Sequence, residues 1–219
     1  MPQLFPRWTN KIPLMLGLGA PVVLGGVVFS VWYWFSPRYT DVGYMPTQPV
    51  AFSHQLHAGQ LGMDCRFCHN TVERAGHAAI PPTQTCMGCH GKLIAAESPL
   101  LAKVRTAYNA NKPIEWTKVH MLPHYAYFDH SIHLAAGVGC TSCHGRIDQM
   151  PVVHQKEPLS MGWCLTCHRN FKPHLRPKDQ ITNMAYDAKA AGYDADKDPA
   201  RTRPANSLNP PKHCSGCHR

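Results

Sequence analysis

The feature that most constrains this 219-residue chain is one short motif, which occurs five times and uses every cysteine. In each copy two cysteines flank two other residues, and a histidine follows the second cysteine directly. Because no cysteine is left over, the sequence predicts no disulfide bond. The cysteines are Cys65, Cys68, Cys86, Cys89, Cys140, Cys143, Cys164, Cys167, Cys214 and Cys217, and the histidines are His69, His90, His144, His168 and His218.

The chemistry of this motif points to covalently attached haem. Two thiols three positions apart reach the two vinyl groups of one porphyrin and form thioether bonds, and the next imidazole lies beneath the iron as its proximal ligand. Zinc knuckles do not need a histidine after every second cysteine, a thioredoxin-like motif occurs once near a βαβ unit, and a disulfide framework does not keep one spacing. The sequence therefore predicts five covalently attached haem c groups.

The motifs are unevenly spaced along the chain. Their first cysteines lie 21, 54, 24 and 50 residues apart, so that short and long intervals alternate. The segment Phe52-Ser-His54-Gln-Leu-His57 precedes the first motif, and Phe128-Asp-His130-Ser-Ile-His133 precedes the third. This internal repeat indicates duplication of a two-haem module, with a fifth haem at the C-terminus. Ser53 and Asp129 are good N-caps, so a short helix is expected to begin in each copy.

Ten histidines lie outside the motifs, whereas five haems need only five distal ligands. Histidines three positions apart share one helix face but diverge, so one can reach the haem of its own module and the other a neighbouring haem. Methionine is the other low-spin ligand, and it raises the potential of the iron. The distal candidates are His54, His57, His120, His130 and His133, with Met161, His77 and His154 as second choices; His124, His174 and His213 are expected to be exposed.

An uncharged apolar stretch occupies residues 12–35. At about 1.5 Å per residue, a helix of this length crosses a bilayer core of about 30 Å. Trp32, Tyr33 and Trp34 stand at its C-terminal end, where the aromatic belt of a membrane helix belongs. A buried core helix and a cleaved signal peptide are the alternatives, but a signal peptide has a shorter apolar core and small residues at its cleavage site. We therefore expect an uncleaved single-pass anchor in the cytoplasmic membrane.

The expected attachment of haem also predicts how the chain is oriented in the membrane. Covalent haem attachment takes place outside the cytoplasmic membrane, so we expect a cytoplasmic N-terminus and a haem domain on the periplasmic face.

The net charge is +9, but the basic residues are scattered and form no run. A nucleic-acid partner is therefore not expected, and the basic side chains are better interpreted as partners of haem propionates.

The fold class predicted is a multihaem cytochrome c: one N-terminal transmembrane helix and a loop-rich, mainly short-helical domain around five c-type haems, with little sheet. Residues 36–219 are too few to build a conventional core around each haem, so the porphyrins must supply much of the buried apolar surface. The expected divisions are 1–11 cytoplasmic, 12–35 anchor, 36–90 first two-haem module, 91–120 linker with a helix near 92–109, 121–168 second two-haem module, and 169–219 an extended segment carrying the fifth haem.

Several blocks carry a specific resemblance. FSHQLHAGQLGMDCRFCH, IPPTQTCMGCH, YFDHSIHLAAGVGCTSCHGRID and LSMGWCLTCHR, with the N-terminal anchor, resemble the pentahaem cytochrome c subunit of alternative complex III over nearly the whole chain. The resemblance implies an electron-transfer subunit that is not an enzyme by itself. In that family His54, His57, His120, His130 and His133 match histidine positions, and Met161 falls in a methionine-containing block.

The same resemblance implies the partners. Upstream it implies an iron–sulfur subunit and polytopic quinol-binding membrane subunits. Downstream it implies a periplasmic acceptor, which is a monohaem cytochrome c, a copper protein or an oxidase. The expected function is therefore electron transfer within a quinol:acceptor oxidoreductase.

Two other functions fit parts of the pattern. A stand-alone membrane quinol dehydrogenase of the NapC/NirT type also joins one anchor helix to several c-type haems, but it contacts quinol itself. A multihaem reductase needs an open coordination position on one iron. This chain has more distal candidates than haem motifs, and none of its motifs ends in lysine, so the reductase is the weaker alternative.

Overall fold

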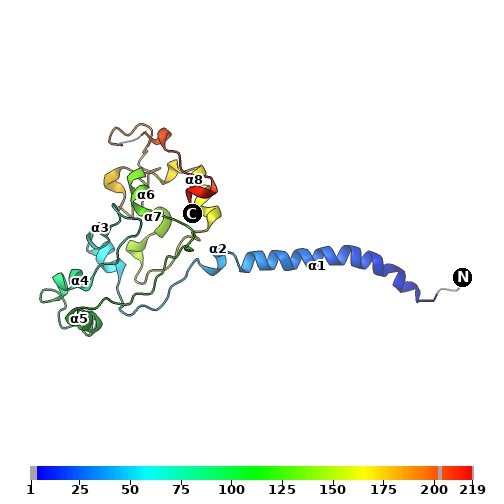
Figure 1. The fold of residues 1–219 in the computed structure, drawn as a ribbon, viewed down its shortest axis with the longest axis horizontal. Helices are drawn as coiled ribbons and strands as arrows, with labels where there is room; N and C mark the ends of the chain where they lie inside the picture. The colour runs from blue at the N-terminus through cyan, green and yellow to red at the C-terminus, as the bar shows by residue number, and fades with distance from the viewer. Residues whose placement is uncertain (1–3, 202–203, 219) are drawn as a thin grey trace. The chain divides into compact units, whose positions relative to one another are not determined.

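The computed structural model describes residues 4–201 and 204–218, and the chain divides into two compact units, Met1–Asp41 and Val42–Arg219. The first unit holds the apolar helix α1 (Ile12–Trp34), which follows the 3₁₀ turn η1 (Arg7–Lys11) and precedes the one-turn helix α2 (Pro37–Thr40). Residues 7–34 are long and apolar enough to cross a membrane, and their most apolar window is not buried in the protein. The apolar stretch at 12–35, predicted as an anchor, therefore forms a helix that ends one residue earlier (Figure 1).

The second unit, here called the C-terminal domain, consists of short helices joined by long loops. Figure 1 shows α3, α4 and α5 toward one end of this domain and α6, α7 and α8 toward the other. The described residues contain no strand, only isolated bridges between Ala126 and His218 and between Val138 and Leu175, so the predicted helical fold with little sheet is confirmed. The helices are α3 (Cys65–Cys68), α4 (Thr83–His90), α5 (Ala102–Asn109), α6 (His130–Ala136), α7 (Thr141–His144) and α8 (Met161–Arg169).

The remaining helical elements are single turns. One is π-helical, η2 (Gln55–Gln60), and it begins within the first copy of the repeat. The others are 3₁₀ turns: η3 (Pro99–Leu101), η4 (Ile147–Gln149), η5 (Lys172–His174), η6 (Lys178–Gln180), η7 (Ala205–Ser207) and η8 (Cys214–Gly216).

The two copies of the repeat begin alike but continue differently. The carboxylate of Asp129 caps α6 by accepting a hydrogen bond from the backbone N–H of Ser131 at 2.8 Å. In the first copy the hydroxyl of Ser53 accepts from the N–H of Leu56 at 3.2 Å, but the chain then widens into η2. Gly59 allows this turn to lie against η4, since a Cβ at Gly59 would collide with the carbonyl oxygen of Asp148.

The linker helix is shorter than the sequence predicted. A helix was expected near 92–109, whereas α5 begins at Ala102 after the 3₁₀ turn η3. Pro99 opens that turn and cannot continue a helix from the preceding residues, and Ala95 has a φ of 49°, which breaks helical geometry upstream. α5 packs beside α4 at one end of the C-terminal domain (Figure 1).

The segment after the fourth motif also differs from the expected extended connection. Leu175, Ala195 and Ala205 form a buried apolar cluster, and Phe171, Tyr193 and Leu208 of the same segment pack against it. The segment folds back on itself through η5, η6 and η7, because prolines that open 3₁₀ turns redirect the chain and its apolar side chains become buried. It therefore supplies a protein-only core next to the second module.

Asp64 joins the first motif to this C-terminal segment. Its carboxylate caps α3 by accepting from the N–H of Arg66 at 2.8 Å, and it also pairs with the guanidinium of Arg66 at 2.9 Å. The hydroxyl of Thr182 donates to the other carboxylate oxygen at 2.7 Å. The hydrogen bond from Arg66 lowers the pKa of Asp64 to about 2, so this group is charged at neutral pH.

We expect Asp64→Ala to lower the free energy of unfolding by about 1 kcal/mol, chiefly through loss of the cap. The ion pair adds little because both side chains are 41% exposed and screened by water. Asp64→Asn keeps an acceptor for the cap and should lose less. Chemical denaturation of the haem-loaded protein measures both changes, and equal losses for the two variants would show that the cap is not the main contribution.

Candidate haem-binding site

Each of the five motifs occupies a single turn of a helical element. Four are carried by α3, α4, α7 and α8, and the fifth by the 3₁₀ turn η8. Residues three apart on one turn lie on one face, so each turn presents its two cysteines together. Among the described residues, no disulfide bond joins any of the ten cysteines. The local fold therefore places each pair of sulfurs as the attachment chemistry requires.

Most of the histidines expected to bind iron have one ring nitrogen engaged by a backbone carbonyl. The ring N–H at Nδ1 donates to that oxygen, so the proton is held on Nδ1 and Nε2 is left as the metal-binding atom. Among the motif histidines the acceptors are Ala79 for His69, Ile94 for His90, Pro211 for His168 and Tyr125 for His218, at 2.7–3.0 Å. Among the distal candidates they are Ser53 for His57, Gly76 for His130 and Asp129 for His133, at 2.7–2.9 Å.

Three distal candidates lie at the distance from a motif histidine that two ligands of one six-coordinate iron require, and each such pair is here called a facing pair. If each Nε2 lies about 2 Å from the metal and each ring centre about 1.2 Å behind its nitrogen, the two ring centres are about 6.3 Å apart. The ring centres are 6.2 Å apart for His57 and His90, 6.3 Å for His130 and His144, and 6.1 Å for His133 and His168. These residues fit an iron porphyrin between each pair.

The pairs follow the internal repeat. The second histidine of each copy faces the second motif of its module, as His57 does with His90 and His133 with His168. The first histidine of the second copy, His130, faces the first motif of its module. In the first copy His54 lies near His69: burial is the main cause that lowers the pKa of His54 to about 4, and the charge of His69 is the next. The two modules thus place their histidines in the same way.

His144 differs from the other motif histidines, because its buried Nδ1 has no hydrogen-bond partner. The buried Nε2 of His120 also lacks a partner, and the ring centres of these two residues are 4.5 Å apart. That distance leaves no room for an iron between them, so in this arrangement His120 lies beside the ring of His144 and does not face it across a metal. The assignment of His120 as a distal ligand stays a prediction.

Three buried histidines make acid destabilising. Burial lowers the pKa of His54 and His120 to about 4 and that of His144 to about 3, from an ordinary value of 6.5. Burial opposes protonation of these imidazoles, and iron bound to His54 and His144 in the haem-loaded protein would oppose it in the same direction. Between pH 6.5 and about 4 the unfolded chain therefore binds more protons than the folded chain, and the free energy of unfolding falls as the pH falls. We expect a loss on the order of several kcal/mol over this window. Thermal unfolding of the haem-loaded protein measures it, and a melting temperature that rises on acidification would contradict the prediction.

The cysteines of the first motif lie near those of both the second and the third motif. Burial raises the pKa of Cys68, and the nearby sulfur of Cys86 raises it further, which places the second motif against the first. The thiol of Cys65 donates a hydrogen bond to the sulfur of Cys140, which raises the pKa of Cys65 and lowers that of Cys140. The first motif is therefore also in contact with the third, and this contact joins the two modules.

The series continues to the C-terminus. Burial raises the pKa of Cys143 to about 12, and the nearby sulfur of Cys167 adds to the effect, so the third and fourth motifs are neighbours. Burial also raises the pKa of Cys164, with the sulfur of Cys217 as the next cause, so the fourth and fifth motifs are neighbours. The five attachment sites therefore adjoin in the order second, first, third, fourth, fifth, which agrees with the placement of α4, α3, α7 and α8 in Figure 1.

A buried arginine stands beside the junction of the modules. Arg176 is 9% exposed, and its guanidinium donates to the carbonyl oxygen of Asn183 at 2.7 Å and to the hydroxyl of Thr141. A Cβ at Gly139 would collide with this side chain, so glycine is required for the close approach. The positive charge of Arg176 contributes to the lowered pKa of Cys140, after the hydrogen bond from Cys65. Sequence reasoning missed this residue because a single arginine carries no pattern.

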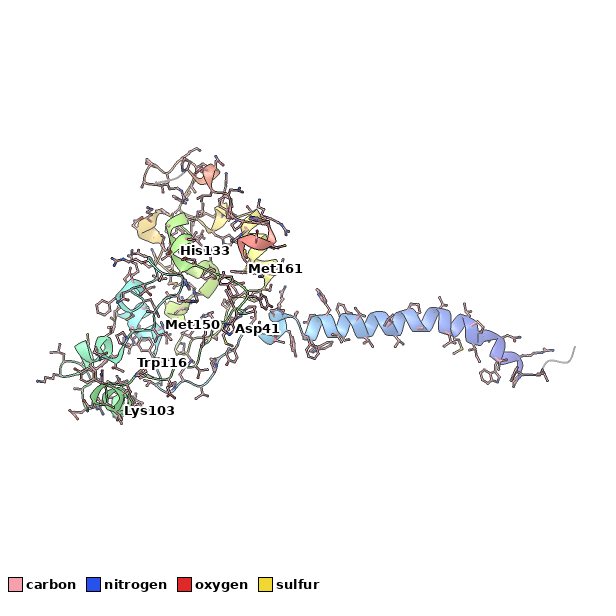
Figure 2. All side chains as sticks on the ribbon, viewed as in Figure 1. Asp41, Lys103, Trp116, His133, Met150 and Met161 are labelled. Carbon is pink, nitrogen blue, oxygen red and sulfur yellow. The ribbon has the colours of Figure 1, made fainter. Side chains whose placement is uncertain are left out.

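The second-choice ligands and the other histidines lie outside the facing pairs. His77 is exposed, and the hydroxyl of Thr71 donates to its carbonyl oxygen at 3.0 Å. His154 is half-buried near His120. Met161 opens α8 and is 61% exposed, and Figure 2 shows it toward the same end of the C-terminal domain as His133. His124 and His213 are exposed as expected, but His174 is half-buried beside the apolar cluster.

Parts of this chain are similar to known cytochromes. Residues 50–110, which hold the first two motifs, match a family model described as "Cytochrome c7 and related cytochrome c". The chain is also 26% identical over 175 residues to the menaquinone reductase multiheme cytochrome c subunit of Nitratidesulfovibrio vulgaris strain Hildenborough, covering 70% of this chain and 82% of that relative. With the helical fold, the apolar N-terminal helix and the repeated cysteine pairs, these matches show that the C-terminal domain is a multihaem cytochrome c domain that carries c-type haems.

Proposed function

We propose that this protein is a membrane-anchored pentahaem cytochrome c, and that it is the electron-transfer subunit of a quinol:acceptor oxidoreductase of the alternative complex III type. Haem iron, when bound, supplies one-electron exchange, and the residues of this chain fix where each iron lies and which ligands it has. The observation that carries the proposal is that the motifs follow one another through the C-terminal domain. Figure 1 shows α4, α3, α7 and α8 in this order, and cysteines of successive motifs lie near one another. Such a series suits a protein that transfers electrons from haem to haem better than an enzyme with one reaction centre.

The ligand assignment follows the three facing pairs and, for the first motif, the nearness of His54 to His69. We assign His54 to the iron of the first motif, His57 to the second, His130 to the third and His133 to the fourth. Among the described residues no histidine ring faces His218 at the required spacing. Met161 is our assignment for that iron, because Cys164 on the same helix adjoins Cys217. A methionine ligand would give this haem a higher potential than the others.

The apolar helix supports the proposed membrane location and partners. Gly17, Gly19, Gly25 and Gly26 of α1 have open space where a Cβ would lie, which suits close packing against helices of other membrane subunits. The resemblance to alternative complex III supports an iron–sulfur subunit and polytopic quinol-binding subunits as these partners. The name of the N. vulgaris relative describes a subunit of a menaquinone reductase, which supports work beside a quinone site. In this account the C-terminal domain lies on the periplasmic side.

A second candidate function is electron transfer through the same haems in the opposite direction. The N. vulgaris relative is named for menaquinone reduction, which favours electron flow from a periplasmic donor to quinone. Rapid mixing of the purified complex distinguishes the two directions. In the first, quinol reduces the haems, and in the second, a reduced cytochrome reduces them and added quinone reoxidises them.

Purification from native membranes in mild detergent tests the proposal. We expect the protein to copurify with polytopic and iron–sulfur subunits, and quinol to reduce its haems. A lone monomer that quinol reduces would instead support the stand-alone dehydrogenase. A large high-spin ferric signal that responds to added small anions would support a multihaem reductase.

A further inference from the structure

We infer that Phe52 and Phe128 are positioning residues, each of which fixes the ring planes of both distal histidines in its module. The inference rests on the proposed function, since it takes those histidines to be axial ligands. Each phenylalanine lies two residues before the first histidine of the repeat, and neither belongs to a haem-attachment motif. One side chain would thereby set the ligand orientation at two neighbouring irons.

The observation is one contact geometry that occurs twice. The ring of Phe52 lies edge-on to His54, with centroids 4.8 Å apart and an interplanar angle of 85°, and it stacks on His57 at 4.4 Å and 21°. The ring of Phe128 lies edge-on to His130 at 4.7 Å and 87°, and nearly parallel to His133 at 4.5 Å and 30°. The two copies are 76 residues apart in the chain, and the second histidine lies in the π-helical η2 in one copy and in α6 in the other. The contact geometry is thus kept although the helical elements that hold the histidines differ.

The contacts restrain rotation of the imidazoles about their bonds to a metal. The stacked ring of His57 is held by Phe52 on one face and by the bond from its Nδ1 to the carbonyl oxygen of Ser53 at 2.8 Å. The stacked ring of His133 is held by Phe128 and by the carbonyl oxygen of Asp129 at 2.7 Å. Rotation of either imidazole would drive its edge into the phenyl face, which close-packed side chains resist.

The first histidines of the two copies differ in their hydrogen bonds, so the two phenylalanines are expected to differ in their effect on ring orientation. His130 donates from Nδ1 to the carbonyl oxygen of Gly76 at 2.9 Å, so Phe128 is not its sole restraint. Within residues 4–201 and 204–218, the buried Nδ1 of His54 has no hydrogen-bond partner. The ring plane of His54 therefore depends on Phe52 more than that of His130 depends on Phe128.

Electron paramagnetic resonance of the oxidised full-length protein in detergent tests this, because the g values of a low-spin ferric haem depend on the planes of its axial imidazoles. We expect Phe52→Leu to shift two of the low-spin signals, with the larger shift at the haem of His69. Phe128→Leu should shift two different signals, with a smaller shift at the haem of His144. Phe171→Leu is the matched control, since Phe171 packs against the apolar cluster, and its spectrum should equal that of the wild type.

Two further variants separate ring orientation from bulk. Phe52→Tyr keeps the ring and should restore the wild-type spectrum, whereas Phe52→Met fills similar space without a ring and should shift the same signals as leucine. Methionine also serves if the leucine variant fails to load its haems. Wild-type spectra from fully loaded leucine and methionine variants would overturn the inference. Failure of the ligand assignment is seen separately, because the wild type would then lack the low-spin signals of paired histidine ligands, and failure of the proposed function is seen in the copurification experiment.

Discussion

Replacing both Cys140 and Cys143 by alanine is expected to leave a four-haem subunit that no longer passes electrons through the complex. These cysteines lie in the middle of the attachment series, since Cys140 contacts Cys65 and Cys143 adjoins Cys167. Loss of this attachment site separates the first two motifs from the last two, and electron transfer falls steeply with distance. Quinol-dependent reduction of the external acceptor should fall to the rate of the complex without this subunit.

The matched control removes a haem from one end of the series. Cys86→Ala with Cys89→Ala also leaves four haems, but the other attachment sites remain contiguous. Partial reduction of this control should still equilibrate among its four haems, whereas in the Cys140/Cys143 variant the two halves should equilibrate separately. If the middle variant turns over at the wild-type rate, the proposed linear order is wrong.

The second large effect is expected at His133. Its ring centre lies 6.1 Å from that of His168, and its Nδ1 is bound to the carbonyl oxygen of Asp129 at 2.7 Å. His133→Ala should therefore leave the iron of the fourth motif without its distal ligand, so that one haem in five becomes high-spin. Electron paramagnetic resonance and the optical spectrum of the oxidised protein measure this change.

A conservative replacement separates ligation from packing at the same position. His133→Met should keep the iron low-spin and raise the potential of that haem by on the order of 0.1 V, a small part of the ~0.8 V range that axial ligands cover. His77→Ala is the control, because His77 is exposed and belongs to no facing pair. An alanine variant of His133 with five low-spin haems would show that this histidine is not an axial ligand.

The features that the sequence predicted well depend on local spacing. The five attachment turns need only residues three apart, the cap of α6 needs only Asp129 and the N–H groups of Ser131 and Ile132, and the apolar helix needs only an uncharged run. Which histidine faces which motif depends instead on contacts distant in the chain. His130, for example, is oriented by the carbonyl oxygen of Gly76, 54 residues earlier.

The features that the sequence did not predict lack such a local pattern. The segment after the fourth motif reads as extended because of its prolines, but sparse apolar residues such as Leu175 and Ala205 fold it into a core. Phe52 and Phe128 were visible as part of the repeat, yet only the ring geometry shows that each contacts two histidines. The order of the attachment sites also differs from their order in the chain, because the first motif, not the second, contacts the third.

The most direct test of the central claim is an experimental density map of the haem-loaded protein, which gives the position and ligands of every iron. We expect five haems in one series, with the haem of the third motif between those of the first and the fourth. We also expect at least four irons to have both a proximal and a distal histidine. A map with fewer haems, or with the haem of the second or fifth motif between two others, would contradict it.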